Sequence, residues 1–145
     1  MNTNVQVYQQ YKRTSVETSP PGKLLLMLYN GCIKNIEHAR TAINEKNPGL
    51  AHEQIVKAQD IIIELMATLN MDYDISQRLL SVYDYIYNQM VEANIKKDGE
   101  LLDEIQVFLV DLRNTWQDAI DKVQSSSPDN AIRDNASTQK FSVTG

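Results

Sequence analysis

Apolar residues recur at alternating steps of four and three residues in four long segments, and this spacing limits the fold more than any other feature. Such steps keep one apolar stripe along one side of an α-helix, a pattern typical of near-parallel helix packing. Residues 20–22, 47–49, 70–74 and 96–99 interrupt the pattern with Pro, Gly, Asn or Asp. The four stripes are Leu25, Tyr29, Cys32, Ile36, Ala39 and Ile43; Ala51, Ile55, Ala58, Ile62, Leu65 and Leu69; Ile75, Leu79, Val82, Ile86, Met90 and Ala93; and Leu101, Ile105, Leu109, Leu112, Trp116, Ala119 and Val123. The spacing therefore predicts four α-helices.

The connections between the predicted helices are short, so consecutive helices should run antiparallel. A chain of 145 residues is long enough for one such domain with its own core. We therefore expect an all-α fold, an antiparallel up-down four-helix bundle over residues 21–124. Residues 1–20 are expected to form a short N-terminal helix or lid, and residues 125–145, rich in Ser, Asn, Asp and Thr, a flexible, disordered tail. Asp74 is a candidate N-cap of the third helix, with Gln77 reaching back to it.

Charge and composition exclude several classes of partner. Lys and Arg total 14 against 19 Asp and Glu, for a net charge of −5, so there is no basic surface to displace phosphate counterions. We therefore expect no nucleic-acid binding and no attachment to an anionic membrane. No apolar stretch approaches the length of a membrane span, and residues 1–11 lack the apolar core of a signal peptide. A cytoplasmic location and no membrane insertion are the expectations that remain.

The residue types that carry catalysis or bind metals are few and badly spaced for either task. The only histidines, His38 and His52, have Asn35 and Gly49 three residues earlier, so neither forms the Glu-x-x-His pair of metal-holding bundles. Cys32 lies six residues before His38, hence on another helix face, which excludes a nucleophile–base couple within that helix. A solvated helix face explains the carboxylates Glu100, Asp103, Glu104 and Asp111. We expect no enzymatic activity, no cofactor and no metal site.

The predicted helices carry more apolar residues than one stripe each requires. A wide core with some exposed apolar residues would account for the surplus, as would a groove for an amphipathic helix from a partner. A homodimer would bury the same surface, so the surplus alone does not separate these alternatives. Tyr83, Tyr85 and Tyr87 cannot share a direction, because positions two apart on a helix differ by about 200°. At least Tyr85 should therefore point away from the other two.

Sequence motifs in every predicted helix resemble the flagellar export chaperones of the FliS family. The resemblance covers about residues 5–122 and is clearest in the first helix, at 27–33. One departure is Pro20, where the family usually has Ser before the proline. The residues that carry the resemblance are Val16, Thr18 and Pro21; Met27-Leu28-Tyr29-Asn30-Gly31-Cys32-Ile33; Lys57-Ala58-Gln59, Ile61-Ile62, Glu64-Leu65 and Leu69-Asn70; Tyr83-Asp84-Tyr85, Ala93-Asn94-Ile95 and Asp98; and Leu112-Arg113, Trp116 and Ala119-Ile120.

The resemblance implies a chaperone in the bacterial cytosol that binds the disordered C-terminal segment of flagellin in apolar grooves. It implies that binding prevents premature polymerisation and aids delivery to a component of the flagellar type III export gate. A second regulator of flagellin assembly is a further expected partner, and the protein itself is expected to be a monomer or a weak homodimer. The alternative is a non-enzymatic, homo-oligomeric regulator whose surplus apolar surface is buried between its own copies.

Candidate client-binding residues are the apolar ones that lie off the predicted stripes. The predicted set is Ile61, Ile63, Met66, Leu80, Tyr83 and Tyr87, with Phe108 as a weaker member. The family resemblance also implies that the N-terminal segment covers a client groove in the empty protein, which makes Val7, Tyr8 and Tyr11 the candidate lid.

Overall fold

The computed structural model describes residues 22–125 of the chain. It contains the helices α2 (Lys23–Asn44), α3 (Pro48–Ala67), α4 (Asp74–Lys96) and α5 (Gly99–Ser125). Within this described part there is no β-strand. The four helices predicted from the apolar spacing, and the all-α fold class, are confirmed.

The chain divides into two compact units, one ending at Asp111 and the other beginning at Leu112, so the division falls inside α5. The described part of the first unit holds α2, α3, α4 and residues 99–111 of α5. In the second unit, the described residues form the last turns of α5, where the Gln117 side chain donates a hydrogen bond to Asp121 at 3.1 Å. The predicted division of the chain at residues 20 and 124 stays a prediction.

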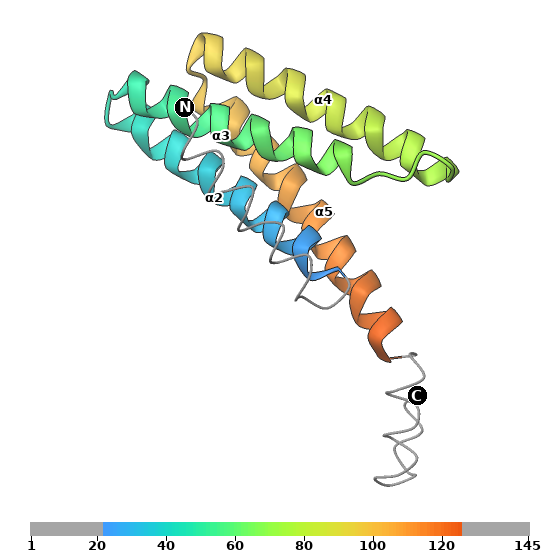
Figure 1. Cartoon of the computed structure of the whole chain (residues 1–145). Helices are drawn as coiled ribbons and strands as arrows, with labels where there is room; N and C mark the ends of the chain where they lie inside the picture. The colour runs from blue at the N-terminus through green and yellow to red at the C-terminus, as the bar shows by residue number, and fades with distance from the viewer. Residues whose placement is uncertain (1–21, 126–145) are drawn as a thin grey trace, which may run out of the picture. The chain divides into compact units, whose positions relative to one another are not determined.

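Within the first unit, α3 packs between α2 and α4, and successive helices run in opposite directions (Figure 1). The first part of α5 contacts the two outer helices of this set. Arg40 of α2 is hydrogen-bonded to Asp103 of α5, and the ring of Tyr85 on α4 contacts that of Phe108 on α5. Short loops and one buried stripe per helix thus produce the antiparallel arrangement that the sequence predicts.

The core of the first unit is formed by one buried stripe from each helix. Two tyrosines are its largest members: Tyr29 of α2 and Tyr83 of α4 are fully buried. Their hydroxyl oxygens are hydrogen-bonded at 2.7 Å, and their ring centroids lie 6.4 Å apart. Because an unpaired buried hydroxyl is costly, this bond makes it possible to bury both tyrosines completely. The other apolar members are Leu28, Cys32, Ile36, Ala39, Ala42, Ala51, Ile55, Ala58, Ile61, Ile62, Leu65, Ile86, Met90, Ala93, Leu102, Ile105 and Leu109.

The buried stripe of α4 differs from the predicted one. Tyr83, expected off the stripe, is in the core, and Ile75, expected in the stripe, is 54% exposed. Ser76 is buried in the first turns of the helix. The prediction was wrong because apolar side chains lie on several sides of α4, so the spacing alone does not say which of two neighbouring stripes faces α3.

The predicted cap of α4 is also wrong. Tyr73, not Asp74, is the N-cap residue; its backbone is extended, with φ −102° and ψ 142°, and it has no side-chain capping bond. Asp74 is instead the first helical residue, so Gln77 is not at the position that a capping box requires. A carboxylate in the first turn still interacts favourably with the helix dipole.

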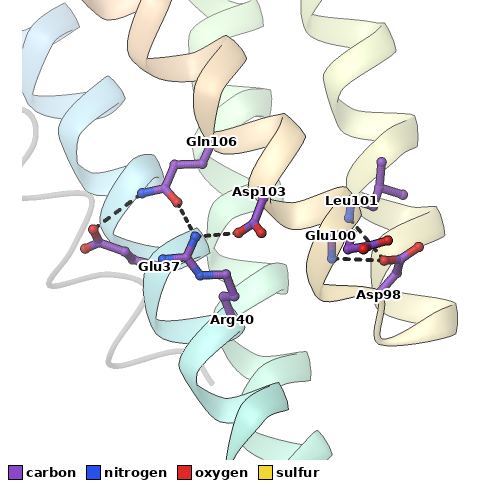
Figure 2. Close-up of polar contacts among 7 residues, drawn as sticks. All are labelled: Glu37, Arg40, Asp98, Glu100, Leu101, Asp103 and Gln106. Carbon is purple, nitrogen blue, oxygen red and sulfur yellow. Dashed lines mark hydrogen bonds and ion pairs between the residues drawn. The ribbon is translucent and has the colours of Figure 1, made fainter.

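Side chains that the sequence analysis did not assign cap two other helices. The Asn47 side-chain oxygen accepts a hydrogen bond from the Leu50 amide at 3.1 Å, at the start of α3. The Asp98 carboxylate accepts hydrogen bonds from the amides of Glu100 and Leu101 at 3.0 and 3.1 Å, at the start of α5 (Figure 2). These three bonds satisfy amides that have no partner within the helix, and so they fix where each helix begins.

The Tyr29–Tyr83 hydrogen bond should appear as a coupling energy in a double-mutant cycle. Tyr29→Phe and Tyr83→Phe each remove one hydroxyl while keeping the ring in the core. Once the hydroxyls no longer interact, the two effects should not add, and we expect a coupling of about 0.5–1.5 kcal/mol in the free energy of unfolding, measured by urea denaturation. Strictly additive effects in the two single variants and the double variant would contradict a stabilising role for the bond.

Candidate functional site

A surface hollow of about 300 Å³ lies between α4 and the first part of α5, entirely within the first unit. We call it the α4–α5 groove. Its lining residues come from one face of each helix: Tyr85, Ile86 and Gln89 of α4, and Leu101, Glu104, Ile105, Val107, Phe108 and Asp111 of α5. Ile86 and Ile105 are core residues, so the floor of the groove is the edge of the hydrophobic core.

The helical period of α5 explains how this helix supplies one wall of the groove. Leu102, Ile105 and Leu109 recur at steps of three and four and are buried in the core. Residues on one side of this stripe, such as Glu104 and Phe108, line the groove beside α4. Residues on the other side, such as Asp103 and Gln106, contact α2.

The groove is rich in exposed apolar side chains. Tyr85 is 54% exposed and Val107 is 62% exposed, although both are large and apolar. The Tyr85 ring contacts the half-buried ring of Phe108, with centroids 6.2 Å apart and planes tilted by 57°. Exposed apolar side chains of this kind make the groove a candidate docking site, and tyrosine suits such a surface because its hydroxyl can stay in water.

The charged members of the groove all have one sign. Glu104 and Asp111 contribute carboxylates, and no Lys or Arg is among the nine lining residues. Both carboxylates are exposed, as the expected solvated face of the last helix requires. The groove therefore combines an apolar floor with an acidic edge.

Polar contacts hold α5 against α2 on the side away from the groove (Figure 2). The Arg40 guanidinium on α2 donates hydrogen bonds to Asp103 and to the Gln106 side-chain oxygen, the latter at 3.1 Å. The Gln106 amide in turn donates to the Glu37 carboxylate at 3.4 Å. Asp103 and Glu37 are exposed and Arg40 and Gln106 are half-buried, so solvent screens these contacts and they orient α5 more than they stabilise the fold.

The predicted binding residues are scattered over the surface and the core. Ile63 and Leu80 are exposed, while Met66, Tyr87 and Phe108 are half-buried. Ile61 and Tyr83 are buried, so the expectation that these two lie on an accessible surface is corrected. Of the seven, Phe108 alone lines the α4–α5 groove. The candidate lid residues Val7, Tyr8 and Tyr11 lie outside the described residues.

Sequence reasoning missed Tyr85 and Val107, the most exposed apolar residues of the groove. The signal for Tyr85 was present, since helix geometry predicts that it points away from Tyr83 and Tyr87, and Tyr83 is indeed buried. The apolar surplus predicts a binding surface on the side of α4 that carries Tyr83 and Tyr87. The side that carries Tyr85 lines the groove instead.

The residues considered for catalysis lie apart from the groove. His38 and His52 are exposed, and the His52 ring nitrogen Nδ1 lies 2.9 Å from the Asn94 side-chain amide. Cys32 is fully buried, with its Sγ 3.6 Å from the Ala58 carbonyl oxygen, and burial raises the pKa of its thiol to about 12.

From residue 22 to residue 125 there is no group of three side chains that could hold a metal ion. Over the same residues, no helix is sufficiently long and apolar to span a membrane.

The raised pKa of Cys32 predicts a loss of stability at alkaline pH. The thiol ionises near pH 9.0 in the unfolded chain and near 12 in the folded protein. Its contribution is therefore fully present below pH 9 and falls as the pH rises toward 12. Between pH 8 and 10 the free energy of unfolding should fall by about 1.4 kcal/mol more in the parent protein than in Cys32→Ala. Equal losses in urea denaturation of the two proteins would contradict this assignment.

Comparisons with known proteins extend over most of the chain. The family model described as flagellar protein FliS matches residues 4–123. The flagellar secretion chaperone FliS of Bacillus subtilis (strain 168) is 43% identical over 113 residues, which are 78% of this chain and 85% of that protein. The flagellar secretion chaperone FliS of Vibrio cholerae serotype O1 is 32% identical over 114 residues, covering 74% of this chain and 84% of that protein.

A solved structure is similar as well. The crystal structure of a flagellar chaperone from bacteria matches with a TM-score of 0.67 and 26% sequence identity, over 82% of this chain and 98% of that one. The agreement of family model, relatives and structure matches the resemblance that the sequence motifs indicate. The chain belongs to the flagellar protein FliS family, and the relatives that it matches are flagellar secretion chaperones.

Proposed function

We propose that this chaperone binds the disordered C-terminal segment of flagellin and that the α4–α5 groove is one of the surfaces that bind it. Binding in the cytosol would keep flagellin from polymerising before export and would bring it to the flagellar type III export gate. No catalytic step is involved. The observation that carries the proposal is the exposed pair Tyr85 and Val107, beside Phe108, above a floor formed by the core.

Helix-in-groove binding suits this surface. An amphipathic helix presents apolar side chains on one face, and each one that is buried can contribute about 1.5–3 kcal/mol. Ordering a disordered segment costs about 1 kcal/mol or more per residue for the backbone alone. Three groove residues thus offset the ordering of only one or two helical turns. We therefore propose that the client also contacts the exposed residues Ile63 on α3 and Leu80 on α4.

A groove variant should weaken binding of the isolated flagellin C-terminal segment. Val107→Asp places a charge where an apolar contact is expected, so affinity should fall by about 10- to 150-fold, or roughly 1.4–3 kcal/mol. Isothermal titration calorimetry gives the affinity, and the parent protein should show the negative heat-capacity change of apolar burial. Ile95→Asp is the matched control, since Ile95 is an aliphatic residue of α4 that is 74% exposed and lies outside the groove.

Normal binding by a folded Val107→Asp protein would exclude the groove from the client site. If Ile63→Asp then weakened binding, the client would lie on α3 instead. Light scattering with and without the flagellin segment tests the alternative function, a homo-oligomeric regulator. An oligomer that ignores the segment, and that Val107→Asp dissociates, would favour that alternative.

We also propose that the N-terminal segment, through Val7, Tyr8 and Tyr11, acts as a lid that competes with the client. If the open form is populated at about 3–15%, removing the competition should tighten binding by about 7- to 30-fold, chiefly through faster association. Tyr8→Ala combined with Tyr11→Ala tests this by stopped-flow fluorescence. An unchanged or slower association rate constant would mean that the segment is no lid.

A further inference from the structure

The acidic edge of the α4–α5 groove is the feature that apolar binding alone does not use. Glu104, Phe108 and Asp111 follow one another at steps of four and three along α5, so they form one ridge beside the groove. The two carboxylates stand about one helical turn on either side of the aromatic ring. Over seven residues of α-helix their separation along the axis is about 10 Å.

We propose that this ridge selects the client by charge: the groove takes an amphipathic helix with lysine or arginine about one turn before and one turn after a central apolar side chain. The inference rests on the proposed function, because it specifies the chemistry of the segment that fills the same groove. In such a complex the central side chain contacts Tyr85 and Phe108. The flanking cations lie over Glu104 and Asp111.

Charge complementarity favours a client helix with basic flanking residues over one with acidic or neutral flanking residues. A helix with acidic flanks would bring like charges against Glu104, and no basic side chain among the lining residues could compensate for them. A helix with neutral flanks would fill the apolar floor and gain nothing from the charges of Glu104 and Asp111. Only a helix with basic flanks gains from both parts of the groove, and complementary charges also speed association.

The test uses the full chain and three synthetic amphipathic peptides of about 18 residues with the same apolar stripe. They differ only at the two positions that flank the central leucine, four residues before it and three after it, which carry Lys, Gln or Glu. Nuclear magnetic resonance titration of the isotope-labelled chain gives both the affinity and the residues contacted. The lysine peptide should shift the amide signals of residues 85–89 and 101–108 and bind about five-fold or more tighter than the glutamate peptide.

Two charge-reversed variants separate the ridge from the general negative charge of the chain. Glu104→Lys should abolish the preference for the lysine peptide over the glutamate peptide, because the ridge then carries one cation and one carboxylate. Glu53→Lys makes the same charge change on the exposed surface of α3, outside the groove, and should leave the order as in the parent. In about 0.5 M NaCl the differences between peptides should shrink, because salt screens the exposed charges.

The inference would be overturned by equal affinities for the three peptides, or by an unchanged order of their affinities in Glu104→Lys. It would also be overturned by signal changes outside the groove or by no binding at all. A homodimer in light scattering that Val107→Asp dissociates would overturn it too, because a second copy would then fill the groove.

The experiments distinguish failure of this inference from failure of the proposed function. A flagellin segment that does not bind, beside an intact lysine preference, overturns the proposed function alone. A segment that binds in the groove equally well to Glu104→Lys overturns the charge inference alone.

Discussion

The buried hydroxyls of Tyr29 and Tyr83 are hydrogen-bonded to each other, and this bond links α4 to α2 through the core. With Tyr83 fixed in the core opposite α2, helix geometry turns the residue two positions later outward, by about 200°. That residue is Tyr85, and it meets Phe108 of α5 at the groove. The burial of Tyr83 against Tyr29 is therefore matched by the rotation of α4 that exposes Tyr85.

The sequence was sufficient to predict the four helices, but it did not predict which face each helix turns toward the core. Alternating steps of four and three, together with the Pro, Gly and Asn breaks, predicted α2 to α5 correctly, because local propensity and periodicity act within a segment. Choosing Ile75 over Tyr83 for the core of α4 was wrong, because this choice depends on contacts between segments. The buried hydroxyl of Tyr83 is hydrogen-bonded to that of Tyr29, which lies 54 residues earlier in the chain. No pattern within α4 contains that information.

The same limit explains which site residues could be predicted. A surplus of apolar residues predicted a binding surface as one alternative, but it did not say where the exposed apolar residues would gather. Phe108 was predicted because it lies off the stripe of its own helix. Val107 and Tyr85 line a surface that exists only where two helices meet, so their roles depend on helix packing. Glu104 and Asp111 were correctly expected to be exposed, and their helical spacing places them beside Phe108, yet their position along a groove shared with α4 follows only from the fold.

Contacts of α5 with α2 and with the core hold this helix in the position that leaves the groove open. A surface with exposed Tyr, Val and Phe would lower its free energy by closing on itself, with α5 rolling toward α4 and burying those side chains. Such a roll would draw Asp103 and Gln106 away from Arg40 and would also pull Leu102 and Leu109 out of the core. The polar contacts contribute little energy on the exposed side, but they have definite directions, whereas the apolar contacts do not. The contacts of α5 with α2 and with the core thus keep Tyr85, Val107 and Phe108 accessible, which the proposed binding of a client in this groove requires.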